Sequence, residues 1–410
     1  MQQRDLIPDL FRTEYSKIVS VLCKRFGMEH IELAEDIAGE TFLLAVESWP
    51  YQGLPENPVA WLYAVAKNKA KNHFTRERIF TEKIAPHLGA FSQEPTEYEI
   101  DLSEKNSTDS QLQMLFAICH PVISAEAQIA LALKILCGFG IDEIADAFMT
   151  SKETINKRLF RAKEKLREEK IQLVFPDSPE VEKRLNAVLT TLYLLFSEGY
   201  YSERKRGAIR RTFCHEAMRL TYLLVAQDQT DQHDTHALFA LMCFHASRLD
   251  ARQNENGELI LYNDQDENLW DHELIERGNF HLQKSAQWKV LSKFGLEARI
   301  AWWHTVKTDS AEKWEHILQL YNHLLQLEYS PIAALNRTYA LSRANGKSAA
   351  IIEAEKLQLT TNHFYYVLLG ELYTDIDNNK ARLQFQKAFS LAKTETDKKT
   401  IQKKMDTFNS

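Results

Sequence analysis

Apolar residues recur every three or four positions along most of this chain of 410 residues, which is the spacing of one face of an α-helix. The first such stripe predicts a helix near the N-terminus and comprises Leu10, Tyr15, Ile18, Val19 and Leu22. The same spacing predicts further helices over 31–49 and 58–80. The second of these has a clear start, because Asn57 can cap it and Pro58 at the first helical position loses no needed N–H.

Residues that make tight turns are scarce. The chain holds 13 glycines and 10 prolines, roughly half the usual combined share of about 12%. Beyond Glu180 the only proline is Pro331. Because sheet-rich folds need many turns, and turns need these residues, the sequence predicts an all-α fold.

A break in the helical pattern separates two small domains. Residues 86–110 combine prolines, serines, threonines and acids without an apolar period, which predicts a linker. A second break at 175–179 contains two prolines and predicts a hinge. The predicted parts are a first helical domain over 1–83, a linker over 84–110, a second helical domain over 111–174 and an extension over 180–410.

Charge is segregated along the chain. The formal net charge of −7 argues against a protein that coats nucleic acid uniformly. Residues 59–83, however, carry six bases and two acids, residues 150–175 carry eight bases and four acids, and residues 84–111 between them carry six acids and one base. Two basic islands separated by an acidic stretch predict two contacts with one polyanion. An extended linker of about 25 residues could span about 80 Å, more than one DNA turn of about 34 Å.

The sharpest local pattern predicts a helix-turn-helix over 141–168. A short amphipathic helix ends near Phe148, and Thr150-x-x-Glu153 has the form of a capping box that opens the next helix. The apolar stripe of that helix lies within an arc of about 60° at about 100° per residue and consists of Ile155, Leu159, Ala162 and Leu166. The opposite side is basic and polar, as in a helix that enters a DNA groove.

The usual signatures of membrane proteins and enzymes are missing. No run of about 18 apolar residues predicts a membrane span, and the N-terminus does not read as a signal peptide. The five cysteines lie at least 18 residues apart, which favours reduced thiols in a cytoplasmic protein. Neither HExxH, GxxxxGK[ST] nor GxGxxG occurs. We therefore expect no enzyme activity, no cofactor and no metal.

Two polar groups in the extension invite a chemical interpretation. His233, His236 and His245 could bind a metal, but their spacing fits no standard site and packing within a helix explains them as well. The segment 264–266, Asp-Gln-Asp, resembles a catalytic carboxylate pair, and a polar turn or buried network is the simpler interpretation because no nucleophile accompanies it.

The extension shows repeat character near its end. Its pattern fits the skeleton of a tetratricopeptide repeat, a helix pair that stacks on its neighbours and presents a concave surface, through Tyr366, Leu369, Gly370, Tyr373, Ala381, Phe385 and Ala388. Residues 334–340 look like a degenerate earlier copy.

The order of these motifs resembles a known family. Segment 34–42 (Ala-Glu-Asp-Ile-Ala-Gly-Glu-Thr-Phe), Trp49 and segment 61–70 resemble region 2 of extracytoplasmic-function (ECF) sigma factors of the sigma-70 family. The helix-turn-helix over 141–168 resembles their region 4. Three further segments resemble the subgroup of these sigma factors that has a long tetratricopeptide-like C-terminal extension. They are 195–200, 264–266 with Trp270, and 330–337.

The resemblance implies bacterial transcription initiation. Such a chain binds core RNA polymerase and directs it to promoter DNA, and catalysis belongs to the polymerase. Region 2 would dock on the polymerase through Glu35, Asp36 and Glu40, and would recognise the −10 element through Trp61, Asn68, Lys71, Asn72 and Arg76. Region 4 would read the −35 element through Ser151, Lys152, Glu153, Thr154, Asn156, Lys157, Arg158 and Arg161. The extension would control activity in cis, in a direction the sequence does not give, by responding to a protein or small ligand.

One position departs from the family pattern. The usual D-x-x-Q-E-x-F stands here as Asp36-x-x-Gly39-Glu40-x-Phe42. Glycine inside a helix costs about 1 kcal/mol relative to alanine, and here it also removes a potential polymerase contact.

Plainer interpretations remain open for these residues. The charged sides of helices 152–168 and 31–49 could simply be solvated, and Glu153 could accept from cytosine or merely close the capping box. Trp61 and Tyr63 could stack on unpaired bases or lie in the core. For the whole chain, the alternatives are a helix-turn-helix regulator with a C-terminal ligand- or protein-binding domain, and an enzyme in 180–410 with a regulatory N-terminus.

Overall fold

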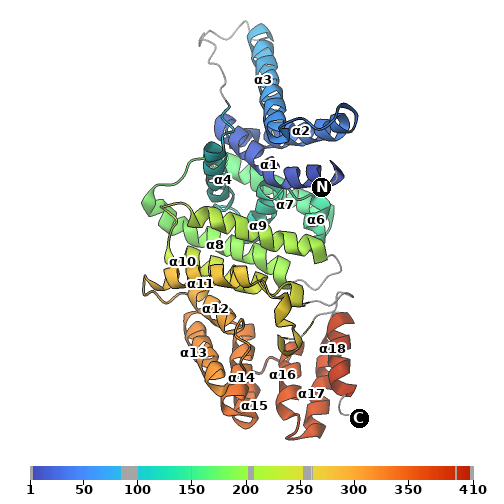
Figure 1. The fold of residues 1–410 in the computed structure, drawn as a ribbon, viewed down its shortest axis with the longest axis vertical. Helices are drawn as coiled ribbons and strands as arrows, with labels where there is room; N and C mark the ends of the chain where they lie inside the picture. The colour runs from blue at the N-terminus through green and yellow to red at the C-terminus, as the bar shows by residue number, and fades with distance from the viewer. Residues whose placement is uncertain are drawn as a thin grey trace. The chain divides into compact units, whose positions relative to one another are not determined.

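The computed structural model describes residues 3–84, 100–148, 150–201, 207–252, 260, 262–392 and 395–406. Within these ranges every regular element is a helix, which confirms the predicted all-α fold (Figure 1). None of the described helices is both long and apolar enough to cross a lipid bilayer. Contacts between Cα atoms divide the chain into two compact units, residues 1–195 and residues 196–410.

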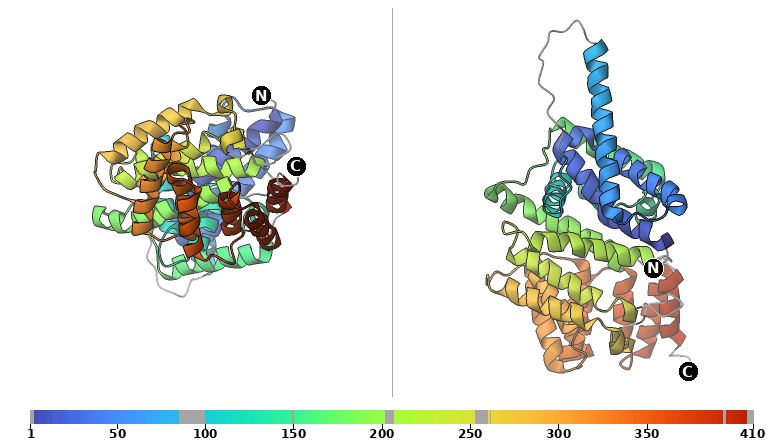
Figure 2. Two further views of the ribbon diagram at one scale, coloured as in Figure 1. Left: turned by 90° about the horizontal axis from the view of Figure 1, so that it is seen from below. Right: turned by 45° about the horizontal axis from the view of Figure 1, so that its top comes forward.

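Unit 1 contains seven α-helices and the first part of an eighth among its described residues. They are α1 (Gln3–Phe26), α2 (Ile31–Gln52), α3 (Pro58–Ile84), α4 (Glu104–Ile118), α5 (Ala125–Leu131), α6 (Ile141–Ala147), α7 (Lys152–Glu168) and α8 (Ser178–Tyr201), with a 3-10 turn at Met28–His30 and a π-helical turn at Ala132–Leu136. Helix α1 packs against α2, α3 and α4, and α3 then projects beyond these neighbours (Figure 2).

The predicted N-terminal stripe is the centre of this packing. Tyr15, Ile18, Val19 and Leu22 are at most 3% exposed, while Leu10 is half-buried. Burying side chains of this size contributes roughly 1.5–3 kcal/mol each, so the stripe of α1 contributes substantially to the stability of unit 1.

Helix α2 is longer than the sequence predicts. It runs through Pro50 to Gln52 instead of ending at Trp49. The helix ends at Gly53, whose φ of 85° suits glycine and whose N–H donates to the Trp49 carbonyl at 3.0 Å. Glycine, not proline, therefore terminates this helix.

The predicted linker also differs from the structure at its C-terminal end. Residues 85–99 lie outside the described residues, but α4 already begins at Glu104, where Ser103 caps it by accepting from the Asn106 N–H. The buried face of α4 includes Ser107, Ser110 and Gln111, and the Gln111 amide donates to the Ser16 hydroxyl at 2.6 Å. Small and hydrogen-bonded polar residues on the buried face explain why no apolar period predicted this helix.

The segment predicted as a hinge is packed into unit 1. Pro176 is buried, and the Phe175 ring lies 5.1 Å from the Phe116 ring. The start of α8 is held there too, because Arg184 donates to the Phe116 carbonyl and Thr191 donates to the Gln128 side chain at 2.9 Å. The division between the units therefore falls inside α8, between residues 195 and 196, and not at 175–179.

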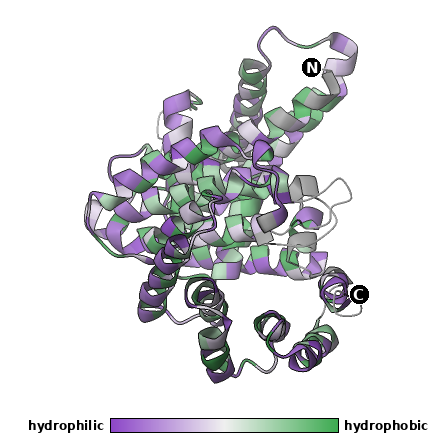
Figure 3. Cartoon of the chain, turned by 60° about the horizontal axis from the view of Figure 1, so that its bottom comes forward, coloured by the Kyte–Doolittle hydropathy of each residue, from purple (hydrophilic) through white to green (hydrophobic). Residues whose placement is uncertain are grey.

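Unit 2 continues from α8 through ten further described helices. They are α9 (Gly207–Val225), α10 (His233–Ala246), α11 (His272–Ala286), α12 (Lys293–Trp303), α13 (Ala311–Leu327), α14 (Pro331–Asn345), α15 (Lys347–Leu357), α16 (His363–Tyr373), α17 (Asn378–Leu391) and α18 (Glu395–Asp406). Three 3-10 turns, Asp250–Arg252, Tyr262–Asp264 and Glu267–Leu269, lie between α10 and α11. Figure 3 shows that individual helices carry both hydrophobic and hydrophilic residues, as the sequence periodicity predicts.

Helices α16 and α17 contact each other closely through the residues of the predicted repeat skeleton. Leu369, Tyr373, Ala381, Phe385 and Ala388 are buried. A Cβ atom on Gly370 would lie only 2.7–2.8 Å from carbons of the Phe385 ring, so glycine is required for this approach. The packing is what the skeleton predicts for one helix pair, while the tetratricopeptide assignment itself stays a prediction.

Candidate polymerase and promoter interfaces

The N-cap of helix α7 lies one residue later in the chain than the sequence predicts. Ser151, not Thr150, is the N-cap, and its hydroxyl accepts from the Thr154 N–H at 3.2 Å. The capping box predicted at Thr150 and Glu153 is therefore wrong. Glu153 lies in the first turn, where hydrogen bonds from its own backbone N–H and from the Ser151 hydroxyl hold the pKa of its carboxyl below the usual range. Its carboxylate is committed to the helix start in this structure.

The amphipathic pattern of α7 is confirmed. Ile155, Leu159, Ala162 and Leu166 are buried and face the rest of unit 1. Most residues predicted to read DNA lie on the remaining surface of α7 or at its cap, and they are exposed: Ser151, Lys152, Glu153, Thr154, Asn156, Lys157 and Arg161. Lys152 forms an exposed ion pair with Asp142 of α6 at 2.7 Å.

Arg158 has a different setting from the other basic residues of α7. It is half-buried, and its guanidinium carbon lies 5.1 Å from the centre of the Phe148 ring. Its Nη1 atom is buried and has no hydrogen-bond partner among the described residues. This arginine therefore packs against the turn between α6 and α7 more than it projects into solvent.

A basic hollow lies beside α7. It has a volume of about 580 Å³, and its lining residues include no carboxylate. The α7 side contributes Thr154, Lys157, Arg158, Arg161, Ala162 and Lys165, and the start of α5 with its preceding turn contributes Val122, Ile123, Ser124 and Ala127. Sequence reasoning missed Lys165 and the α5 side, because residues 30 positions apart carry no periodic signal that joins them. The hollow can accept a phosphate backbone or the edge of a base.

The residues predicted for the −10 element separate into two groups. Asn68, Lys71 and Asn72 are exposed at helical spacing on one side of α3, and the side chain of Arg76 lies outside the described residues. Trp61 instead packs edge-on against buried Trp49, with ring centres 5.4 Å apart. Its half-buried ring is thus partly committed to the core.

Tyr63 is fixed by a neighbouring carboxylate. Its hydroxyl donates to buried Glu14 of α1, which also pairs with Lys17 at 2.9 Å. Burial, with the bond to Glu14 second, raises the pKa of this phenol far above its usual value. The structure therefore favours the core interpretation of Tyr63 over base stacking.

The acidic side of α2 is mostly paired. Glu35 forms an ion pair with Lys163 of α7, and both side chains are only 11% exposed. Glu32 pairs with Arg167 of α7 at 2.8 Å, and Glu40 pairs with Lys69 of α3 at 2.7 Å. Asp36 is exposed. Of the three predicted polymerase contacts, Glu35 and Glu40 are thus engaged within the chain, and only the pair of Glu35 is largely buried. Glu35 and Lys163 are 128 residues apart, a pairing that no local pattern indicates.

One of the three histidines singled out in the extension, His236, lies in a hydrogen-bonded chain. His236 is buried, its Nε2 lies 2.5 Å from Asp231 Oδ1, and its Nδ1 lies 2.7 Å from Nδ1 of His281. Both ring nitrogens of His236 are therefore occupied. Among the described residues no group of three side chains is arranged to hold a metal ion. His281 and Asp231 carried no signal in the sequence.

Comparisons with known families cover two segments of the chain. Residues 10–79, from α1 into α3, match the family described as Sigma-70 region 2. Residues 184–286 match a family described as a family of unknown function, DUF6596. The chain therefore carries a sigma-70 region 2 at its N-terminal end.

Two curated proteins are similar to this chain. An uncharacterized protein of Rhizobium meliloti (strain 1021) is 31% identical over 383 residues, which cover 92% of this chain and 90% of that protein. The chain belongs to the same family as that protein. The RNA polymerase sigma factor YlaC of Bacillus subtilis (strain 168) is 28% identical over 169 residues, which cover 41% of this chain and 93% of YlaC. The search of solved structures found no match to this chain.

We expect Glu35 and Lys163 to be strongly coupled in stability. Glu35→Gln or Lys163→Met alone should each cost about 2–4 kcal/mol of unfolding free energy, since either leaves a largely buried charge unpaired. The double variant should recover much of the loss. The exposed pair of Asp142 and Lys152 is the matched control, with an expected coupling below about 1 kcal/mol. Urea unfolding of each cycle measures both couplings, and equal values would contradict the importance of burial here.

Proposed function

We propose that this chain is an RNA polymerase sigma factor of the ECF type, which binds core RNA polymerase and directs promoter-specific initiation. The observation that carries the proposal is the match of residues 10–79 to sigma-70 region 2. The similarity to YlaC over 169 residues supports it, because that length exceeds region 2 alone. In this role the chain is not an enzyme and needs no cofactor.

The second half of unit 1 is proposed to act as region 4. Helices α6 and α7 are joined by a four-residue connection, and α7 exposes Lys157 and Arg161 opposite its buried stripe. The carboxylate-free hollow beside α7 supports a contact with the −35 element. Asn68, Lys71 and Asn72 on α3 give a second polar surface, proposed to meet the −10 element.

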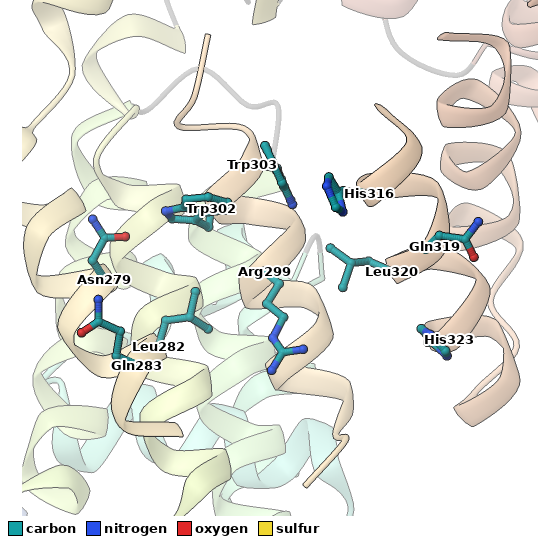
Figure 4. Close-up of a pocket in the computed structure, with 10 residues that line it drawn as sticks. All are labelled: Asn279, Leu282, Gln283, Arg299, Trp302, Trp303, His316, Gln319, Leu320 and His323. Carbon is teal, nitrogen blue, oxygen red and sulfur yellow. The ribbon is translucent and has the colours of Figure 1, made fainter. Parts of the chain in front are cut away.

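Unit 2 is proposed to regulate these modules in cis. The similarity to the sigma factor YlaC covers only 41% of this chain. Residues 196–410 form a compact unit of their own, with a groove of about 670 Å³ (Figure 4). Helices α11, α12 and α13 line the groove, and Trp302, Trp303 and Arg299 stand on α12. Aromatic surface together with a cation and amide groups suits a protein segment or a small ligand.

Binding to core polymerase tests the first proposal. Asp36→Lys and Glu40→Lys should weaken assembly at least tenfold while leaving the unfolding free energy within about 1 kcal/mol, because Asp36 is exposed and the pair of Glu40 with Lys69 is partly exposed. Glu182→Lys, an exposed acid on α8, is the control and should bind normally. Gly39→Gln should fold, since nothing lies within 4 Å of a Cβ there, and should bind more tightly. A native chain that does not bind core enzyme at micromolar concentration would contradict the proposal.

Promoter reading is tested on α7. Lys157→Ala and Arg161→Ala should each weaken binding to the −35 element by about 1–3 kcal/mol. A changed base preference in run-off transcription identifies a base contact, whereas a uniform loss with a flatter salt dependence identifies a phosphate contact. Lys183→Ala, on exposed α8 surface, should change neither. Unaltered binding by both α7 variants would mean that α7 does not enter the groove.

Regulation in cis can be tested by shortening the chain at the division between the two units, after residue 195. A chain ending at Leu195 keeps the contacts of α8 with Phe116 and Gln128, which a chain ending at Leu173 would lose. We expect run-off transcription from its promoters to change at least several-fold, up or down, relative to the full chain. Circular dichroism of the shortened chain checks that unit 1 is folded. Equal transcription by two folded proteins would show that unit 2 has no such role.

A further inference from the structure

Unit 2 contains an arginine with a buried nitrogen that has no hydrogen-bond partner among the described residues. Arg248 follows the end of α10 and is 6% exposed. Within the described part of the chain its guanidinium makes no hydrogen bond and no ion pair, and its Nε atom is fully buried. Its one side-chain contact of note is the Tyr262 ring, with the guanidinium carbon 5.5 Å from the ring centre. A cation–π contact replaces only part of the hydration that an arginine side chain gives up on burial.

A second buried cation contacts the same tyrosine. Lys313 of α13 is 2% exposed, and its Nζ lies 5.2 Å from the Tyr262 ring centre. It donates to the Tyr262 hydroxyl at 3.1 Å and to the Val306 carbonyl. No carboxylate of the described residues pairs with it. Its pKa is lowered, mainly by burial and also by Arg248, although Asp309 acts in the opposite direction.

Two buried histidines, one of them beside Tyr262, experience the same positive potential. The His304 ring lies 5.2 Å from the Tyr262 ring, and burial, followed by Arg248 and Lys313, lowers the pKa of His304 to about 3. Burial and the neighbouring Arg248 and Arg252 likewise lower the pKa of His245. These histidines stay neutral at pH 7, so the cationic charge is carried by the arginines and lysines.

Two buried hydrogen-bond donors near Tyr262 also lack acceptors among the described residues. The Trp270 ring stacks on the Tyr262 ring, with ring centres 6.4 Å apart. The Trp270 Nε1 and the Arg248 Nε are both buried, and neither has a hydrogen-bond partner among the residues that the structure describes. Buried donors are nearly always satisfied in folded proteins. Two unpartnered donors, one on Arg248 and one on Trp270, therefore form an unusual concentration around Tyr262. Both donors point to the same missing chemistry, an acceptor with negative charge.

The acids nearby are engaged elsewhere or lie outside. Asp309 accepts from the Trp314 indole and pairs with Arg343. Asp266 caps the turn that begins at Glu267, and Glu267 itself lies 3.8 Å from Lys307 with its side chain 55% exposed. Asp264 is exposed. None of these carboxylates neutralises Arg248.

We propose that Arg248, Lys313 and Trp270 form a binding site for a small oxyanion, a phosphate or carboxylate group. Such a group accepts charge-assisted hydrogen bonds from a guanidinium fork, an ammonium and an indole N–H, and so supplies what each of the three side chains lacks. The site lies close to the surface, since Tyr262 is half-buried and the neighbouring Lys307 side chain is 28% exposed. The proposal does not depend on the function of unit 1.

Thermal unfolding of the full chain in sodium phosphate, compared with sodium chloride at equal ionic strength, tests the site. The native chain should show a midpoint that rises with the logarithm of phosphate concentration, as expected for a ligand that binds only the folded state. Arg248→Met should lose this rise while unfolding no lower than the native chain without phosphate, because it removes an unpaired buried charge. Arg337→Met is the matched control: this arginine already donates to Asn322 at 2.6 Å, so its loss should leave the phosphate response intact.

Sodium sulfate and sodium acetate identify the class of oxyanion. A response to phosphate and sulfate alone indicates a tetrahedral anion, and a response to acetate indicates a carboxylate group. The proposal is overturned if Arg248→Met responds to phosphate as the native chain does, or if the native chain shows no response beyond that to chloride. It is equally overturned if Asp264→Asn lowers the midpoint while Arg248→Met removes that effect, since an internal carboxylate would then be the partner.

Discussion

The ion pair between Glu35 and Lys163 is the largely buried charged contact that joins α2, in the first helical part of unit 1, to α7, in the second. Each side chain is largely withdrawn from water and is compensated by the other. A buried charge that loses its partner costs several kcal/mol, whereas an exposed pair contributes little, so this one contact holds α7 to α2 more firmly than the exposed pairs around it. Helix α7 accordingly has three surfaces: the buried stripe, the side with Lys163 and Arg167 that meets α2, and the side with Lys157 and Arg161 that meets solvent. At about 100° per residue Lys163 lies about 120° around the helix from Lys157, which keeps the two basic surfaces apart.

The spacing of apolar residues was sufficient to predict which side of an individual helix is buried. The stripes of α1 and α7 are buried as predicted, because a helix that packs on one side needs an apolar residue every three or four positions. The start of α4 was missed for the opposite reason, since Ser107 and Ser110 fill its buried face with small hydroxyls that bond back to the helix. The capping error at α7 is of the same local kind: Thr150 and Ser151 are both good caps, and the choice between them depends on the turn that precedes the helix.

The sequence was sufficient to predict which residues of the candidate site are exposed. It was not sufficient to predict which residues from different helices pair with one another. Asn68, Lys71 and Asn72 share a side of α3 by spacing alone. The pairing of Glu35 with Lys163, and the pairing of Tyr63 with Glu14, join residues far apart in sequence and are fixed only when helices pack. The same holds in unit 2, where Asp264-Gln265-Asp266 attracted notice as carboxylates, while the unusual chemistry lies in the cations that surround Tyr262.

The pairing of α2 with α7 also bears on how a sigma factor of this architecture would engage polymerase and promoter. In the described arrangement Glu32 and Glu35 face α7, so a polymerase surface can reach Asp36 and Glu40 without disturbing the pair but cannot reach Glu35. A basic group of a partner could bind Glu35 only after the ion pair between Glu35 and Lys163 of α7 had broken. The free energy of breaking that pair would therefore be subtracted from the free energy of binding. An apparent affinity is reduced by the fraction of molecules in the competent state, so a pair worth about 2 kcal/mol would weaken a contact at Glu35 by about thirtyfold. The exposed acids of α2 are therefore the better first contacts, and Glu35 contributes to docking only if a partner replaces Lys163.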